Sequence, residues 1–137
     1  MGKFEFSNFS KLDTPMVIDG VSMPTLEHAF QGLKTKVLAE RQKIFSATTP
    51  GRAKRAGGKV SLREDWHEIK VDVMRSLLEI KFEKGTSWRK KLDSTKGERL
   101  VEWNCWHDNF WGDCECQKCT DIEGQNMLGK LLMEIRT

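Results

Sequence analysis

The chain has 137 residues, of which 38% are hydrophobic and 31% are charged, and its formal net charge is +3. This length fits one domain with one hydrophobic core, and this balance of apolar and charged residues excludes a disordered chain. The small positive charge permits a phosphate-bearing ligand without predicting a nucleic-acid groove, and no stretch approaches the roughly 20 apolar residues that span a bilayer.

The first third of the chain is predicted to form short strands and then a helix. Residues 3–9 begin with alternating apolar and polar side chains, which is typical of a short strand. The run "MVIDGVSM" places two β-favouring stretches around Asp19 and Gly20, which is a hairpin signal. We expect Pro24 and Thr25 to open a helix. Its apolar residues at helical spacing are Leu26, Phe30, Leu33 and Val37.

Three further helical segments are predicted in the middle of the chain. Residues 38–48 form a second short helix or extend the first. In "TTPGRAKRAGG", Thr49 can cap a short basic helix that has Pro50 at its first position and stops at Gly57-Gly58. The longest helical pattern runs from Trp66 to about Phe82. Its predicted apolar face consists of Trp66, Ile69, Val73, Leu77 and Ile80.

The last third is predicted to contain little regular structure before a final helix. A short helix over 87–92 is followed by "RLVEW", which favours a strand, and by a long loop over 107–126. Asn126 can cap a last helix. The apolar residues of that helix are Leu128, Leu131, Leu132 and Ile135. These elements predict an α+β fold: a single helix-rich domain over residues 1–137 with a small antiparallel β-sheet.

Polar side chains of the first predicted helix share one face. Glu27, Gln31 and Lys34 are spaced i, i+4 and i+7, about a quarter-turn from the apolar stripe. A polar stripe that borders the core indicates a helix lining a cleft. The alternative is a solvated face with one weak charge pair, and His28 alone is more typical of a packed or capping histidine.

Two other stretches carry candidate chemistry. The basic segment after Pro50 combines helix-start N–H groups with Arg52 and Lys54, which is typical of an anion site, although a solvated basic turn fits as well. "EWNCWHDNFWGD" concentrates tryptophans in a predicted loop, and Asp108 follows a strand end, where catalytic carboxylates are often placed. The alternative is that these tryptophans, Trp103 first among them, pin the loop to the core.

The cysteines suggest a metal site. We expect a cytoplasmic protein, because the first residues lack the apolar segment of a secretory signal, and in that reducing compartment cysteines serve as thiols or metal ligands. The C-x-C-x₂-C run of Cys114, Cys116 and Cys119 predicts a structural, non-catalytic zinc ion. Cys105 is the preferred fourth ligand, because a Cys₄ set uses every cysteine, and His107 is the second choice. Free thiols in a mobile loop are the alternative.

Five motifs in order give the chain a family resemblance. They are "FSNFS", "MPTLEHAFQGLK", "LREDW…VDVMRSLLEIKF", "LVEWN…HDNFWG" and "GQNMLGKLLMEIR". Together they resemble the NADAR family, also called YbiA-like, over nearly the whole chain. The resemblance implies a helix-rich α+β fold and cleavage of N-glycosidic bonds, either in ribosylaminopyrimidine phosphates of riboflavin synthesis or in ADP-ribosylated guanine of nucleic acid.

The resemblance also implies site residues. Glu27, Lys34 and Asp108 are implied as catalytic. The implied or expected substrate contacts are Asn8, His28, Gln31, Arg52, Lys54, Trp66 and Trp111. Trp66 is expected to stack on the flat base, and the cations to hold a phosphate. The cysteine loop between Gly112 and Gly124 departs from relatives that have a short Gly-rich loop there.

The predicted function is therefore an N-glycosidase acting on a small nucleotide-like molecule or on ADP-ribosylated nucleic acid, with no catalytic cofactor and no membrane partner. Two carboxylates suit acid and base roles around a cationic transition state, and Lys34 offers a Schiff-base route. The alternative is a non-catalytic module that binds ADP-ribose or another NAD-derived ligand. A zinc-stabilised interaction protein would leave the cleft residues unexplained.

Overall fold

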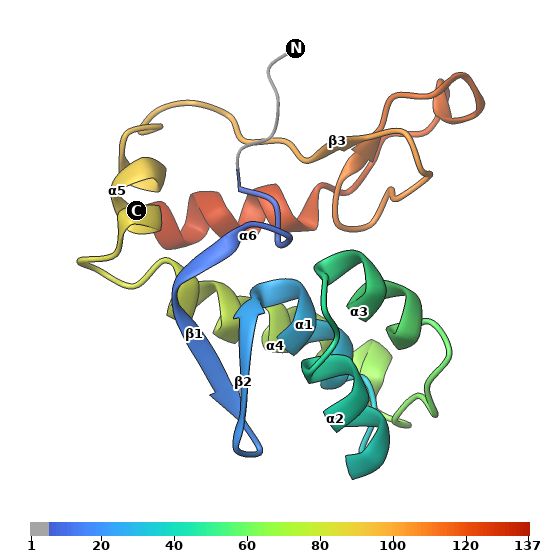
Figure 1. Ribbon diagram of the computed structural model, residues 1–137. Helices are drawn as coiled ribbons and strands as arrows, with labels where there is room; N and C mark the ends of the chain where they lie inside the picture. The colour runs from blue at the N-terminus through green and yellow to red at the C-terminus, as the bar shows by residue number, and fades with distance from the viewer. Residues whose placement is uncertain (1–5) are drawn as a thin grey trace.

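The computed structural model describes residues 6–137, and it has the α+β architecture that the sequence predicts (Figure 1). In chain order the elements are β1 (Lys11–Ile18), β2 (Val21–Thr25), α1 (Leu26–Gly32), α2 (Leu38–Phe45), α3 (Pro50–Gly57), α4 (Trp66–Lys81), α5 (Ser87–Asp93), β3 (Trp103–Asn104), β4 (Asp113–Cys114), the 3₁₀ turn η1 (Gln117–Cys119) and α6 (Met127–Arg136). Within these residues, no helix is both long enough and apolar enough to cross a membrane.

The predicted hairpin is confirmed. β1 and β2 pair antiparallel with Ile18 opposite Val21, and both turn residues, Asp19 and Gly20, have positive φ, as the tight turn requires. The predicted strand over residues 3–9 lies partly outside the described residues, and its described part, from Phe6 onward, forms a turn instead.

The start of the first helix differs from the prediction by two residues. Pro24 and Thr25 belong to β2, and Thr25 is the N-cap of α1, where its Oγ1 accepts from the backbone N–H of His28 at 3.3 Å. All seven residues of α1 are buried, so this helix has no solvated face.

The first helix is also shorter than predicted. α1 ends at Gly32, where a side chain would collide with the ring of Phe45, and Val37 is 46% exposed at the start of α2. Residues 38–45 therefore form a separate helix, α2, rather than an extension of α1.

The remaining helices lie close to the predicted ranges. Thr49 caps α3 and Gly58 ends it, as the local signals indicated. α4 buries Trp66 and Leu77 as predicted, but its other fully packed apolar residues are Met74 and Leu78, and Ile80 is 54% exposed. A one-residue rotation of the predicted stripe accounts for the difference, because residues 74, 77, 78 and 81 share one helical face.

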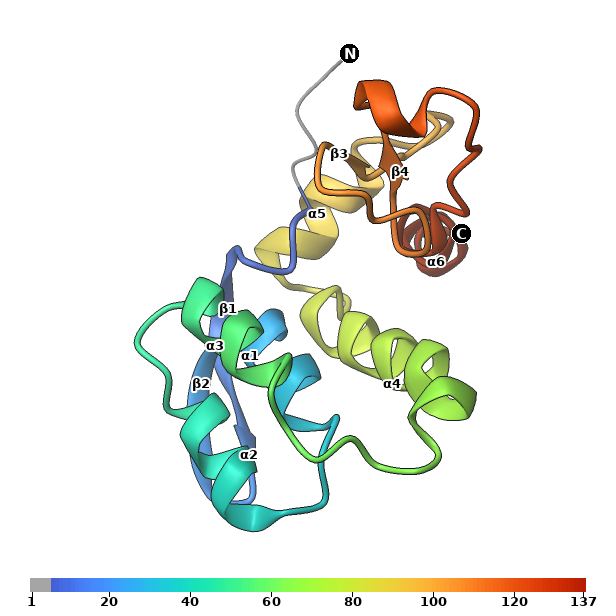
Figure 2. The ribbon, with the colours of Figure 1, turned by 90° about the vertical axis from the view of Figure 1, so that its right-hand side faces the viewer.

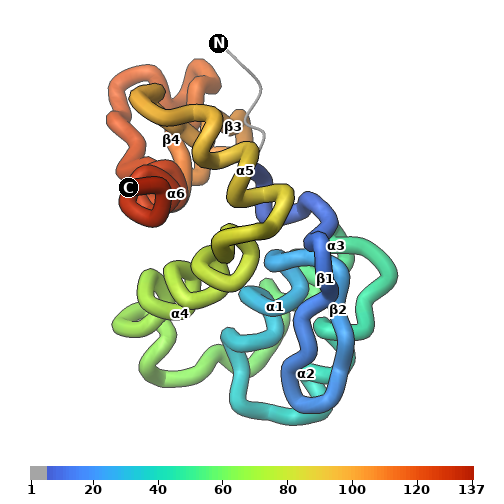
Figure 3. Tube along the Cα trace, turned by 90° about the vertical axis from the view of Figure 1, so that its left-hand side faces the viewer, coloured from blue at the N-terminus to red at the C-terminus, as the bar shows by residue number. Residues whose placement is uncertain are grey.

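Figures 2 and 3 show the molecule from opposite sides, and in both α4 and α5 connect two parts. One part is formed by the hairpin with α1, α2 and α3, which contact one another. The other is formed by α6 and the irregular segment that carries β3, β4 and η1. α4 contacts α1 on one side and α6 on the other. The two parts thus face each other across α4, and the candidate site lies between them.

Candidate active site

A cavity of about 640 Å³ opens between the part formed by the hairpin, α1, α2 and α3 and the irregular segment that carries β3, β4 and η1. Seven of its lining residues were predicted as site residues: Asn8, Glu27, Gln31, Lys34, Lys54, Asp108 and Trp111. Seven more were not predicted: Ser7, Phe9, Phe30, Met74, Glu102, Trp103 and Trp106. Its size lies within the range of small-molecule sites, and it combines several aromatic rings with a few converging charged groups.

α1 supplies one wall of the cavity, with Glu27 at its centre. Glu27 is only 7% exposed, and the side-chain amide of Gln31 donates to its Oε2 at 2.5 Å. α3 packs close behind them, because Gly57 has no side chain: a Cβ there would lie 2.0 Å from the side-chain Oε1 of Gln31. Gln31 therefore lines the cavity and also fixes the orientation of the Glu27 carboxylate.

Burial favours the neutral forms of Glu27 and Lys34 on this wall. It raises the pKa of Glu27, an effect opposed by the Gln31 hydrogen bond and by the nearby Lys54 and Lys34. It also lowers the pKa of Lys34, an effect that the Glu27 carboxylate opposes. A buried carboxylate beside a lysine with a lowered pKa is an arrangement typical of catalytic sites.

Glu102 is the main functional candidate that the sequence reasoning missed. Burial, together with the charges of Asp108 and Glu27, raises the pKa of Glu102 to about 7. Its Oε2 is buried and, among the described residues, has no hydrogen-bond partner. The signal in the sequence is an acidic residue beside the apolar residues of "RLVEW", a run whose pattern predicts only a strand.

Asp108 stands on the opposite wall, in a segment held by side-chain hydrogen bonds. Its Oδ1 accepts from the backbone N–H groups of Phe110 at 3.1 Å and Trp111 at 2.9 Å. Asn104 holds the same turn, because its Oδ1 accepts from the Asp108 N–H and its Nδ2 donates to the Asp108 carbonyl. These contacts fix the direction in which the Asp108 carboxylate points.

The strand predicted near this wall is much shorter than expected. β3 covers only Trp103 and Asn104, and it pairs in parallel with β4 instead of joining the hairpin. Gly112 permits this pairing, because a Cβ there would lie 2.2 Å from the Glu102 carbonyl oxygen.

The N-terminal turn closes a third side of the cavity. The buried ammonium of Lys81 donates to the carbonyl of Ser7 at 3.0 Å, and the Asn8 side chain donates to the sulfur of Met74 at 3.7 Å. The Asn8 Oδ1 is buried and has no hydrogen-bond partner among the described residues. The lining thus offers acceptors, on Asn8 and Glu102, that suit the hydroxyl and N–H donors of a ligand.

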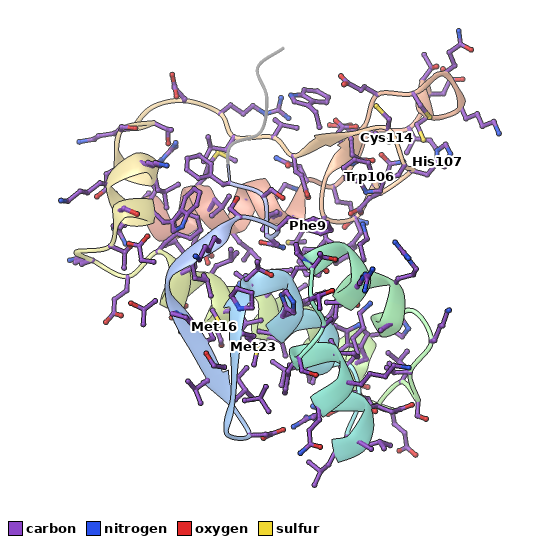
Figure 4. All side chains as sticks on the ribbon, in the orientation of Figure 1. Phe9, Met16, Met23, Trp106, His107 and Cys114 are labelled. Atoms are coloured by element: carbon purple, nitrogen blue, oxygen red, sulfur yellow. The ribbon has the colours of Figure 1, made fainter. Side chains whose placement is uncertain are left out.

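Aromatic rings form the inner wall and the rim. Phe30 packs against Trp111, with ring centroids 5.5 Å apart. At the rim Phe9 is 40% exposed and Trp106 is 58% exposed, and both are labelled in Figure 4. The ammonium of Lys54 lies 5.8 Å from the Phe9 ring centroid and 5.3 Å from that of Trp106, so one cation contacts both rim rings.

The structure corrects three expected substrate contacts. His28 is 0% exposed; its Nε2 donates to the Ala47 carbonyl, so its Nδ1 accepts from the Thr25 hydroxyl, and the side chain is a core residue. Arg52 is exposed and lies outside the cavity lining. Trp66 is 4% exposed and packs behind Phe30 at a centroid distance of 5.0 Å, where no base can stack on it.

A second group of side chains, which could hold a metal ion, lies on the same segment as Asp108. His107, Cys114, Cys116 and Cys119 each offer one ligand atom, and these atoms all lie within 4.8 Å of one another. Cys105, the preferred fourth ligand, is exposed and lies outside this group, so that choice is wrong. The reason is local: the turn that Asn104 holds directs His107, and not Cys105, toward the other cysteines.

Comparisons with known proteins agree on one family. The profile of the NADAR domain matches residues 2–137. N-glycosidase YbiA of Escherichia coli K12 is 39% identical over 134 residues, covering 96% of this chain and 79% of that protein. The maize protein named riboflavin biosynthesis protein PYRR, chloroplastic, is 34% identical over 147 residues, covering 96% of this chain and 23% of that one. The NMR structure of E. coli YbiA has a TM-score of 0.78 at 38% identity, covering 96% of this chain and 74% of that chain.

Proposed function

The chain belongs to the NADAR family, and we propose that it is an N-glycosidase that hydrolyses the bond between a phosphorylated ribose and a nitrogenous base. One observation carries the proposal. Glu27, Glu102 and Asp108, from opposite walls, line one cavity together with Lys34 and Lys54. A pure binding site has no need of three carboxylates beside a desolvated lysine, whereas cleavage through a cationic sugar does.

Glu102 is the proton donor in this proposal. Its pKa of about 7 keeps a large fraction of the carboxyl group protonated at neutral pH, and a general acid works best when its pKa lies near the working pH. It protonates the leaving nitrogen of the base as the bond from that nitrogen to C1 breaks. Glu27, buried and held by Gln31, stabilises the positive charge that develops at C1.

Lys34 is the nucleophile. Opening of the ribose ring gives an imine between C1 and the base nitrogen, and the ring oxygen takes up the proton that this nitrogen loses. The neutral amine of Lys34, favoured by burial, adds to C1, and the base leaves with the proton from Glu102. Water, oriented by Asp108, then hydrolyses the imine on Lys34, which frees the amine and the sugar.

The rim sets the orientation of the substrate. A flat base can stack on the exposed ring of Trp106 at the rim, while the sugar extends inward to the carboxylates. A phosphate on the sugar would meet the ammonium of Lys54, which takes over part of the role first expected of Arg52.

The names of relatives support one substrate class. The maize relative is named as a riboflavin biosynthesis protein, and a 31% identical protein of Vibrio vulnificus carries the same description. We therefore propose ribosylaminopyrimidine phosphates as the first substrates to test, with ADP-ribosylated guanine as the second.

The test is a substrate panel. Purified protein is incubated with a ribosylaminopyrimidine phosphate, with common nucleotides and with ADP-ribosyl-guanosine, and the freed base is measured by mass spectrometry. We expect release of the base from at least one ribosylated compound, and release should stop in Glu27→Gln. If every compound were recovered intact, including one that binds tightly, the protein would be a binding module and the proposal would fail.

A further inference from the structure

We propose that His107, Cys114, Cys116 and Cys119 bind one zinc ion, which holds the cavity wall that carries Asp108. Figure 4 labels His107 and Cys114 on the segment above α3, beside Trp106. The cluster is separate from the cavity: none of its four residues lines it. This inference does not depend on the proposed reaction, because the ion can be measured without any substrate.

The distances in the cluster fit tetrahedral zinc. The His107 Nδ1 lies 3.3 Å from the sulfur of Cys116, 3.4 Å from that of Cys119 and 3.9 Å from that of Cys114. Bond lengths of about 2.3 Å to sulfur and 2.0–2.1 Å to nitrogen place tetrahedral N and S ligands roughly 3.6 Å apart. The three distances lie on both sides of that value, as expected for ligands that surround one ion.

The backbone brings the ligands together from three short elements. Cys114 ends β4, which pairs with β3, and Cys119 ends η1. His107 has φ 68°, in the left-handed region that a residue with a side chain rarely adopts. Such a conformation persists where the surroundings require it, and here it belongs to the turn that presents the His107 ring to the sulfurs.

The side chain of Asn109 forms hydrogen bonds to the cluster, as outer-shell residues do to the ligands of a metal ion. The amide nitrogen of Asn109 donates to the Cys119 sulfur at 3.4 Å, while its oxygen accepts from the backbone N–H of Cys114 at 2.9 Å. Donors to a ligating sulfur stabilise its thiolate form and fix its position. Asn109 therefore links two of the ligand residues.

A site of four protein ligands is closed, so the ion is structural. Its effect on the reaction is indirect. His107 stands between Trp106 and Asp108 in the sequence, and both of these line the cavity. Fixing His107 fixes its neighbours on either side, in a segment whose strands are only two residues long.

The first test is metal content. Protein purified without chelator or metal-affinity resin is analysed by elemental mass spectrometry, and its reactive thiols are counted in the native state. We expect about one zinc per chain and one freely reactive thiol, that of the exposed Cys105. Substoichiometric zinc that does not rise to one equivalent when Zn²⁺ is added, with four reactive thiols, would overturn the proposal.

The second test identifies the ligands. Cys119→Ser and His107→Ala should lose the zinc, whereas the matched controls Cys105→Ser and His67→Ala, both exposed and outside the cluster, should keep it. Loss of zinc in Cys105→Ser with retention in His107→Ala would overturn the ligand set. Cobalt substitution of the unmutated protein needs no variant: thiolate charge-transfer bands with tetrahedral d–d bands are expected, and an octahedral spectrum would contradict the site.

Discussion

The two walls of the cavity are held in different ways. The Glu27 wall rests on α1, which is buried along its whole length and contacts α2, α3 and α4. The Asp108 wall has two strands of two residues each, and its geometry depends on side-chain hydrogen bonds from Asn104, Asn109 and Asn126.

The two walls of the cavity are therefore ordered by different kinds of interaction. The packing of apolar surface fixes the Glu27 wall, and individual polar contacts, together with the proposed zinc ion, fix the Asp108 wall. Both walls must hold their carboxylates in place for the proposed reaction, because the bond to be broken lies between them. Perturbing one wall at a time therefore shows whether the comparison is sound.

The largest effect is expected when the carboxylate of either wall is neutralised. Glu27→Gln and Asp108→Asn should each lower kcat by roughly 10²–10⁴-fold, since each group acts on the reacting sugar or water. Circular dichroism should show an unchanged fold. Glu68→Gln, an exposed carboxylate on α4, is the matched control and should keep full activity. Near-normal turnover in either variant would remove that wall from the mechanism.

A second test of the Glu27 wall concerns the role of Lys34 as the nucleophile. Borohydride added during turnover should trap a sugar adduct on Lys34, and Lys34→Arg should be as inactive as the carboxylate variants, because a guanidinium keeps the charge but is not a nucleophile. Lys36→Arg, at an exposed neighbouring lysine, is the control and should still form the adduct. An active Lys34→Arg with no trapped adduct would reduce Lys34 to an electrostatic contact.

The stability of the two walls should respond differently to the loss of one polar side chain. Asn126 is 3% exposed; its Nδ2 donates to the Leu100 carbonyl and its Oδ1 accepts from the Glu102 N–H. Asn126→Gly, which suits the positive φ there, should cost about 1–3 kcal/mol for each backbone group left unpaired. Thr49→Ala, which removes the cap of α3, should cost about 1 kcal/mol. Denaturant unfolding measures both, and equal costs would contradict the comparison.

The last expected effect is a pH dependence that Glu102 introduces. Its folded-state pKa of about 7 lies above the ordinary value of 4.5, so between these pH values the folded state holds more protons than the unfolded state. The free energy of unfolding should therefore fall as pH rises through this window, by at most about 1.4 kcal/mol per pH unit.

Glu102→Gln tests this dependence directly. Relative to the unmutated protein, the variant should gain stability at pH 8 and show little gain at pH 4.5. Glu68→Gln should follow the unmutated protein at both values. Parallel pH profiles for the unmutated protein and Glu102→Gln would show that Glu102 is not desolvated in the folded state.

The sequence predicted best where the signals are local. The cap Thr49, the helix-start Pro50 and the stop at Gly57-Gly58 lie within ten residues of one another, and α3 has those bounds. The hairpin around Asp19-Gly20 is equally local. The Glu27–Gln31 spacing correctly placed two cavity residues, because helix geometry alone puts them on one face.

The sequence predicted least where contacts between residues that are distant in the chain determine the position of a side chain or strand. Trp66 was expected to stack on the base, but the packing of α4 against α1 buries it behind Phe30. The parallel β3–β4 pair and the exclusion of Cys105 follow from the turn that Asn104 holds, which no periodic pattern records. Glu102 escaped notice because its importance comes from a cavity that forms only when the two walls meet.

The most direct test of the central claim is cleavage in ¹⁸O-labelled water. The account predicts that the released ribose phosphate carries one ¹⁸O at C1 and that the base carries none, with free ribose phosphate incubated beside Glu27→Gln as the control for exchange. Recovery of intact ligand from a protein that binds it, or a product sugar with no label above that control, would contradict the proposal that this cavity hydrolyses an N-glycosidic bond.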